Sequence, residues 1–241
     1  MLRVDQITVR RGSKISLQDV SFTLSRQRSL AVVGESGAGK STLINSILGL
    51  VPFTSGTINW DGEHVRKCRP ALVMQEPRSA FNPRLSLGHS VMEPLKAEYK
   101  KLDRNRFGRL CKRLEIPKDL LDRRMSEVSI GQAQRVGILR ALIAGAPLIL
   151  FDEPLSALDA VTQKHTARLI ADLQEQEGFA ALIVTHDLGY AAAFSDNIAV
   201  LRAGRLEELT PTATFIERPQ SEYGCSLRDA AYALGALERV A

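Results

Sequence analysis

A stretch of small and polar residues near the N-terminus has the residue types needed to hold phosphate groups. It reads Gly34-Glu35-Ser36-Gly37-Ala38-Gly39-Lys40-Ser41-Thr42. This is the P-loop pattern G-x-x-x-x-G-K-[ST], in which glycines let backbone N–H groups turn toward phosphate oxygens. A helix that begins at the end of the loop adds partial positive charge there. We expect residues 34–42, called the P-loop below, to bind a nucleoside triphosphate, with Lys40 on the β- and γ-phosphates and Ser41 on Mg²⁺.

A second group with chemical potential is a pair of carboxylates at the end of an apolar run. The run reads Leu148-Ile149-Leu150-Phe151-Asp152-Glu153. Buried parallel strands meet their ligands at the carboxyl edge of the sheet. We expect Asp152 to hold Mg²⁺ through water and Glu153 to polarise an attacking water as a general base. Such a pair alone is commonly only a strand end, but together with a P-loop it is typical of many enzymes that hydrolyse nucleoside triphosphates.

The segments around these residues alternate between short apolar strands and helices. Residues 29–33 predict a buried strand before the P-loop, and a helix is expected from about 40 to 50. The alternation resumes after Pro147, with strands at 148–151, 180–184 and 198–201 and helices at about 160–175 and 188–194. This pattern predicts an α/β core.

Two further regions depart from the α/β alternation. Residues 1–28 alternate apolar and polar side chains, and a hairpin is expected at 57–62, which together indicate a small antiparallel sheet. Residues from about 76 to 145 are mostly helical and are broken by prolines into short helices. The expected fold is therefore a P-loop NTPase core with an N-terminal antiparallel β-subdomain and an inserted α-helical subdomain at about 76–145.

Composition limits the function classes. The 241 residues are 44% hydrophobic and 24% charged, which is ordinary for a globular protein. No apolar run approaches the roughly 18 residues needed to span a bilayer, and the start lacks a signal-peptide pattern. We expect a cytoplasmic chain that contacts a membrane only through a partner. Cys68, Cys111 and Cys225 lie far apart without a CxxC pattern, so reduced thiols are expected rather than disulfides or zinc.

The chain carries a net charge of +5, and its basic residues concentrate between 100 and 124. Aromatic side chains, which would stack on bases, are sparse in that segment. A solvated helix face therefore explains the charge better than a nucleic-acid surface does.

The segment between the P-loop and the carboxylate strand is more specific. It reads Val128-Ser129-Ile130-Gly131-Gln132-Ala133-Gln134-Arg135-Val136. It resembles the signature segment of ABC ATPases, whose usual form is L-S-G-G-Q followed by Q-R-V. Gln75 resembles the family's Q-loop glutamine, residues 156–159 (Ser-Ala-Leu-Asp) its D-loop, and His186 its switch histidine. The resemblance covers about residues 1–215 and leaves 216–241 as a short C-terminal extension.

This resemblance implies the ABC ATPase fold and a mechanism. Two such domains face each other head to tail, and Ser129, Gly131 and Gln132 of one close over ATP held by the P-loop of the other. Hydrolysis reopens the pair and drives a membrane partner. The residues with implied catalytic roles are Lys40, Gln75, Glu153 and His186. Those implied to bind Mg²⁺ are Ser41, Gln75 and Asp152.

The chain departs from the family pattern at two places. Ile130 replaces the usual third-position glycine of the signature, and a β-branched side chain permits neither unusual φ values nor close approach. We expect it to weaken the composite site that uses this signature. The aromatic residue that usually stacks on adenine is also missing, because that stretch reads Val9-Arg10-Arg11-Gly12. Either Arg10 or Arg11 stacks its guanidinium on the base, or no substitute exists.

One subfamily fits best. Segments 79–84 (Ser-Ala-Phe-Asn-Pro-Arg) and 93–95 (Glu-Pro-Leu) resemble the ATPases of bacterial importers for dipeptides, oligopeptides, nickel and metal-chelating opines. The implied partners are a second, different ATPase subunit, two transmembrane permease subunits and an extracytoplasmic solute-binding protein, on the cytoplasmic face of the inner membrane. The ATPase is not expected to touch the transported substrate or nucleic acid.

Three other interpretations stay open from the sequence alone. They are an ATPase of another ABC importer or exporter class, a soluble ABC protein without a transporter, and a regulatory subunit that binds nucleotide without hydrolysis.

Overall fold

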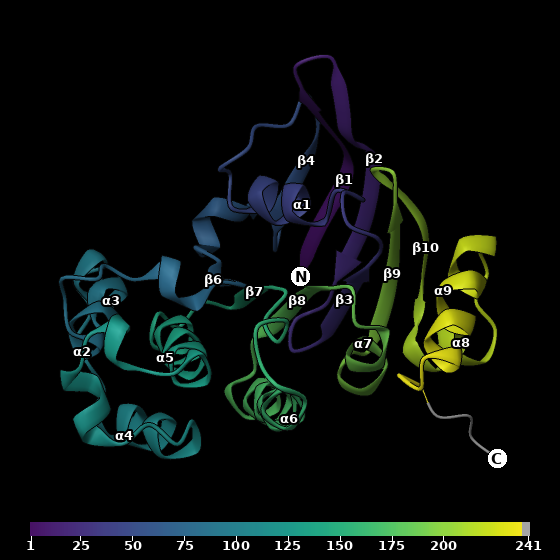
Figure 1. Ribbon diagram of the computed structural model, residues 1–241. Coiled ribbons are helices and arrows are strands. Elements are labelled where there is room, and N and C mark those ends of the chain that lie inside the picture. The colour runs from purple at the N-terminus through teal and green to yellow at the C-terminus, as the bar shows by residue number, and fades with distance from the viewer. Residues whose placement is uncertain (238–241) are drawn as a thin grey trace.

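A six-stranded sheet forms the centre of the computed structural model, which describes residues 1–237 (Figure 1). Residues 238–241 of the predicted C-terminal extension lie outside this described part. The strand order is β10-β9-β3-β8-β7-β6. Their bounds are β3 Ser29–Val33, β6 Ala71–Val73, β7 Leu148–Asp152, β8 Ala180–Thr185, β9 Asn197–Arg202 and β10 Arg205–Pro211. All adjacent pairs are parallel except β9 with β10.

The strand that leads into the P-loop lies in the interior of this sheet. β3 pairs with β8 on one side and β9 on the other, and Val33 lies opposite both Thr185 and Val200. All five residues of β3 are buried. A strand covered on both faces needs an uninterrupted apolar run, which explains the sequence of residues 29–33.

A second, antiparallel sheet has the order β2-β1-β4-β5. It consists of β1 Leu2–Arg11, β2 Lys14–Leu24, β4 Ser55–Trp60 and β5 Glu63–His64. Its apolar face packs with helix α1 (Lys40–Ile47) against one side of the central sheet (Figure 1). The predicted alternation of residues 1–28 is thus the alternation between this buried face and solvent.

Helices α6 (Ala160–Glu177) and α7 (Leu188–Phe194) lie on the opposite side of the central sheet (Figure 1). Alternate residues along a strand pack on opposite sides of the central sheet. Leu148 and Leu150 belong to the core under α1, whereas Ile149 and Phe151 belong to the core shared with α6. The period of two along β7 therefore assigns its side chains to different cores on the two sides of the sheet.

The region after β6 is helical and lies beyond the edge of the central sheet that β6 forms (Figure 1). It contains α2 Leu87–Val91, α3 Glu93–Ala97, α4 Arg104–Arg113 and α5 Ile130–Ile143, with short 3₁₀ turns at Pro77–Ala80, Lys118–Asp122 and Met125–Glu127. At the opposite edge, α8 (Thr212–Glu217) and α9 (Glu222–Ala233) lie beside β10. The predicted fold class is confirmed.

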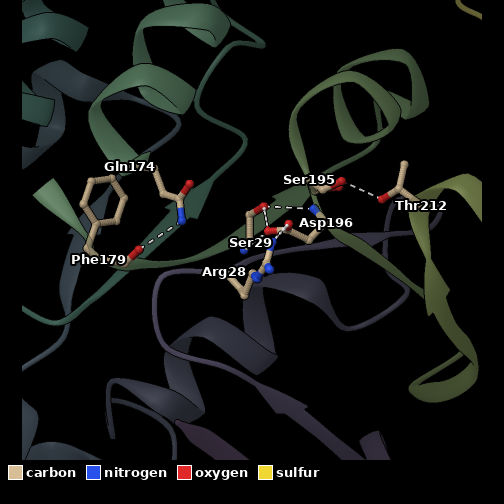
Figure 2. A network of polar contacts seen from close by, with 7 residues as sticks. All are labelled: Arg28, Ser29, Gln174, Phe179, Ser195, Asp196 and Thr212. Atoms are coloured by element: carbon tan, nitrogen blue, oxygen red, sulfur yellow. Dashed lines mark hydrogen bonds and ion pairs between the residues drawn. The ribbon is translucent and has the colours of Figure 1, made fainter. Parts of the chain in front are cut away.

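A polar network ties the start of β3 to the start of β9 (Figure 2). The Asp196 carboxylate accepts hydrogen bonds from the Ser29 N–H at 2.7 Å, the Ser29 hydroxyl at 2.8 Å and the Arg28 guanidinium at 2.7 Å. These donors hold the pKa of Asp196 below its usual value despite partial burial. The network fixes the amino end of the strand whose other end opens into the P-loop.

None of the helices within residues 1–237 combines the length and apolar character needed to cross a membrane.

Candidate nucleotide-binding site

The P-loop opens into a cleft of about 980 Å³ at the carboxyl ends of the parallel strands. Six P-loop residues line it, together with Gln75, Glu153 and His186. The P-loop members are Ser36, Gly37, Gly39, Lys40, Ser41 and Thr42. Gly34, Glu35 and Ala38 shape the loop but do not line the cleft. Residues from four separate parts of the sequence thus meet at one sheet edge, as predicted for ligand binding in open α/β sheets.

Two glycines of the loop are required by its geometry. Gly39 has a φ of 110°, and a Cβ there would lie 2.7 Å from the Ser16 carbonyl oxygen. A Cβ on Gly34 would lie 2.1 Å from the Leu201 carbonyl oxygen. The loop can therefore turn into α1 only with glycine at these positions.

Lys40 is the first residue of α1 and is 8% exposed. Its ammonium group donates to the carbonyl oxygens of Gly34 at 2.7 Å and Glu35 at 3.0 Å. Burial lowers the pKa of Lys40, while the negative charges of Glu153 and Asp152 act in the opposite direction. The site thus holds a desolvated cation at the place where phosphate charge is expected.

Asp152 ends β7 and is the polar group with the clearest need for a ligand. One carboxylate oxygen, Oδ1, is buried and has no hydrogen-bond partner within residues 1–237. Burial and the charge of Glu153 raise the pKa of Asp152, and Lys40 and Ser41 partly oppose this. A hard divalent cation prefers such oxygen ligands, so Asp152, Ser41 and Gln75 fit a Mg²⁺ site.

Glu153 adopts a strained backbone conformation for a non-glycine residue, with a φ of 48°. Its N–H donates to the Val184 carbonyl at 2.9 Å, which anchors the turn to β8. The carboxylate Oε2 lies 2.7 Å from His186 Nδ1. The turn therefore directs the Glu153 side chain toward His186 and the cleft, where a water could be activated.

The signature segment lines a different cleft of about 400 Å³. It shares this cleft with the predicted D-loop, since Ala157, Leu158 and Asp159 line the opposite wall. The two clefts have no lining residue in common within the described part of the chain. The structure does not bring Ser129, Gly131 and Gln132 into the P-loop cleft.

Ser129 and Gln132 form a capping box at the start of α5. The Ser129 hydroxyl accepts from the Gln132 N–H at 3.2 Å, and Gln132 Oε1 accepts from the Ser129 N–H at 3.0 Å. This arrangement satisfies two donors at the helix N-terminus. The two side chains therefore stabilise the helix whether or not they also contact a phosphate.

Ile130 corrects one part of the sequence interpretation. It is the first residue of α5 and is absent from the positions with positive φ. A β-branched residue can adopt this helical conformation, so the expected conflict with backbone φ was wrong. The side chain is 41% exposed in the signature cleft. The remaining reason to expect a weakened composite site is that this side chain hinders the close approach of a partner.

Several cleft residues were not found as site residues by sequence reasoning. Lys14, Ile15 and Ser16 at the start of β2, and Ala203 and Gly204 between β9 and β10, line the P-loop cleft. Arg11 lines it as well, whereas Arg10 does not. The turn at Gly12 was the available signal, because it folds β2 back beside Arg11.

The fold and this cleft define a P-loop NTPase. The ABC transporter family model matches residues 17–156, which is more than half of the chain. The chain therefore belongs to the ABC transporter family and carries its ATPase domain, which confirms the resemblance of the signature segment.

Three curated relatives show how far the similarity extends. The oligopeptide transport ATP-binding protein OppF of Bacillus subtilis is 36% identical over 235 residues, covering 91% of this chain and 77% of that protein. A putative peptide import ATP-binding protein of Brucella ovis is 35% identical over 227 residues, covering 89% of this chain and 72% of that protein. OppF of Haemophilus influenzae is 36% identical over 208 residues, covering 80% of this chain. The match spans only 63% of that Haemophilus protein.

Solved structures agree with this assignment. The ATP-binding cassette MJ0796, described as a dimer in a post-hydrolysis state bound to ADP and Pi, has a TM-score of 0.77 and 27% identity. The match covers 88% of this chain and 99% of that one. For cbiO1 from Clostridium perfringens the TM-score is 0.79, with 24% identity and coverage of 97% and 98%. The latter likeness supports the fold alone.

Proposed function

We propose that this chain is the ATP-hydrolysing subunit that powers a bacterial ABC importer for peptides. The observation that carries the proposal is the convergence of Lys40, Glu153 and His186 in one cleft, beside a buried and unpartnered oxygen of Asp152. The names of the similar proteins support peptides among the predicted substrate classes and do not mention nickel or opines.

The chemistry follows from the positions of the side chains. The P-loop N–H groups and Lys40 bind the phosphates, and Glu153 accepts a proton from the attacking water. His186 contacts Glu153 and is placed to orient the γ-phosphate. A Mg²⁺ ion held by Ser41, Gln75 and Asp152 supplies charge stabilisation for the phosphates when bound.

A second ATPase domain completes the site in this proposal. The signature segment and the P-loop line separate clefts, so each needs the complementary cleft of a partner. Two permease subunits and an extracytoplasmic solute-binding protein complete the importer, which places this chain at the cytoplasmic face of the membrane. The chain then uses the energy of ATP without touching the transported peptide.

Arg11 is proposed to replace the missing aromatic residue at the base of the nucleotide. It lies in the P-loop cleft beside Lys14 and Ile15. A planar guanidinium can stack on a purine ring, and Ile15 offers an apolar surface beside it. Arg10, the other candidate, does not line this cleft.

The test is ATP turnover by the chain with its partner ATPase and membrane subunits, with and without Glu153→Gln. Loss of the general base should lower turnover about 10²- to 10⁴-fold while ATP still binds. Glu175→Gln, the same change at an exposed position on α6, should leave turnover unchanged.

Two outcomes would replace the proposal. Binding of ATP without turnover in any assembly would favour the regulatory subunit. Turnover that requires ribosomes or DNA rather than membrane subunits would favour the soluble ABC protein. Stimulation by a solute-binding protein loaded with something other than a peptide would keep the motor but change the substrate class.

A further inference from the structure

The N-terminus of the C-terminal helix α9 is fixed to the central sheet by a buried carboxylate. Glu208 of β10 is 6% exposed. Its Oε2 accepts hydrogen bonds from the backbone N–H of Gln220, at 2.7 Å, and of Ser221. Ser221 caps α9 through the Gly224 N–H at 2.8 Å. A Cβ on Gly224 would lie 2.7 Å from Glu208 Oε1, so helix and carboxylate are in close contact.

This attachment places Tyr223 behind the P-loop. Tyr223 is 8% exposed and belongs to the same core cluster as Val33, the residue before Gly34. The Arg202 guanidinium lies 4.7 Å from the centre of the tyrosine ring. Arg202 follows Leu201, whose carbonyl is in close approach to Gly34. The ring thus contacts Arg202, which follows the carbonyl that approaches Gly34, and belongs to the same core cluster as the residue before Gly34.

The hydroxyl of Tyr223 is a buried polar group within this cluster. It makes no hydrogen bond of ordinary geometry within residues 1–237. Burial raises the pKa of Tyr223, and the backbone and carboxylate of Glu35 are close enough to act on it as well. Glu35 is the second residue of the P-loop, so the charge and backbone of the loop act on this hydroxyl.

The C-terminal segment also touches the other side of the site. A Cβ on Gly189 would lie 2.4 Å from the carbonyl oxygen of Ala236. Gly189 lies in the first turn of α7, and this helix begins directly after His186 and Asp187. The Asp187 side chain caps the helix by accepting from the Tyr190 N–H at 2.9 Å. The segment therefore contacts α7, the helix that begins two residues after His186.

We propose that residues 218–237 are a positioning element for the nucleotide site, with Tyr223 as the positioning residue for the P-loop. The inference rests on the proposed function, because it concerns ATP affinity at that cleft. A phosphate-binding loop must be held within about 0.5 Å of its productive geometry by surrounding packing. Neither Tyr223 nor Ala236 lines the P-loop cleft, so both act through the elements they contact.

The experiment compares two substitutions in the same core cluster. Tyr223→Leu removes the ring that lies against Arg202, and Phe215→Leu removes a ring of 0% exposure from the same cluster but from helix α8. ATP affinity is measured by calorimetry and stability by thermal unfolding. Both variants should lose stability, but only Tyr223→Leu should weaken ATP binding, by about fivefold. Tyr223→Phe, which keeps the ring, should restore most of the affinity.

Amide hydrogen exchange gives a second readout. ATP should slow exchange in residues 222–233, because coupling between two sites is reciprocal. Equal ATP affinity in wild type and Tyr223→Leu, or an equal loss of affinity in Phe215→Leu, would overturn the proposal. An exchange rate in α9 that is the same with and without ATP would overturn it as well. Failure of the wild-type chain to bind ATP would instead overturn the proposed function, so the two failures are distinguishable.

Discussion

The pKa values of the carboxylates beside the P-loop cleft and in the signature cleft are shifted in opposite directions. Asp152 is half-buried, and its pKa is raised chiefly by burial. Asp159 is solvent-exposed and caps α6 through the Thr162 N–H at 3.0 Å, which lowers its pKa. The first carboxylate is held in an unfavourable environment, whereas the second is already stabilised by the fold.

The same contrast holds for the neighbouring polar groups. Lys40 is buried among carbonyl groups, and Asp152 has an oxygen without a hydrogen-bond partner within the described residues. The phosphates of a bound nucleotide can compensate the charge of Lys40, and a bound cation can compensate that of Asp152. Ser129 and Gln132 already satisfy each other at the start of α5. From this difference we infer that the P-loop cleft performs the chemistry, while the signature cleft contributes closure and the N–H groups of a helix N-terminus.

The largest expected effect tests where nucleotide affinity resides. Lys40→Met should weaken ATP binding to the isolated chain by about 10- to 100-fold, because a charge-assisted bond to phosphate is lost. Arg135→Met, which removes a cation from the signature cleft, should leave this affinity near the wild-type value. Calorimetric titration of both variants with ATP measures the difference. A similar loss of affinity in both variants would mean that ATP affinity does not reside mainly in the P-loop cleft.

A smaller effect is expected at the rim of the signature cleft. Ile130→Gly should raise ATP turnover of the assembled complex by about fivefold, since relief of a crowded contact is worth roughly 1 kcal/mol. Steady-state turnover with the partner ATPase and membrane subunits is the measurement, and ATP affinity of the isolated chain should not change. Unchanged or lower turnover would show that the isoleucine is compatible with closure.

The smallest effect concerns stability and its dependence on pH. Because the folded-state pKa of Asp152 is raised, ionisation of this group destabilises the fold as pH rises through that pKa. Asp152→Asn should therefore unfold a few degrees higher than wild type at neutral pH, with the difference vanishing below the ordinary aspartate pKa of about 4. Asp159→Asn should show no such gain, because its carboxylate is stabilised in the fold. Thermal unfolding across pH measures both.

Sequence patterns predicted the parts of the site that depend on local chemistry. The glycines before Lys40 require a tight loop, and the apolar run before Asp152 requires a buried strand, so both were predictable without the structure. The helix cap at Ser129 also had a local signal, since Ser followed three residues later by Gln is the capping-box pattern.

Contacts between distant segments were not predictable in this way. Tyr223 lies against Arg202 because Glu208 fixes α9 beside β10, and no local periodicity encodes that pairing. Lys14 enters the nucleotide cleft only because the antiparallel sheet packs above α1. The family's glycine at the position of Ile130 was interpreted as a backbone requirement, whereas Ile130 begins α5 without a positive φ.

The position of β3 in the sheet has a consequence for biosynthesis. Its two neighbours, β8 and β9, end at Thr185 and Arg202, so roughly 170 residues separate Val33 from the completion of its pairing. At about 5–20 residues per second, the ribosome needs roughly 10–30 s to deliver them. During that time the nascent chain carries β3, which is apolar at four of its five residues and has two unpaired edges, a segment prone to aggregation. The strand that leads into the ATP-binding loop is therefore among the last to complete its pairing, whereas all strands of the antiparallel sheet lie within the first 64 residues.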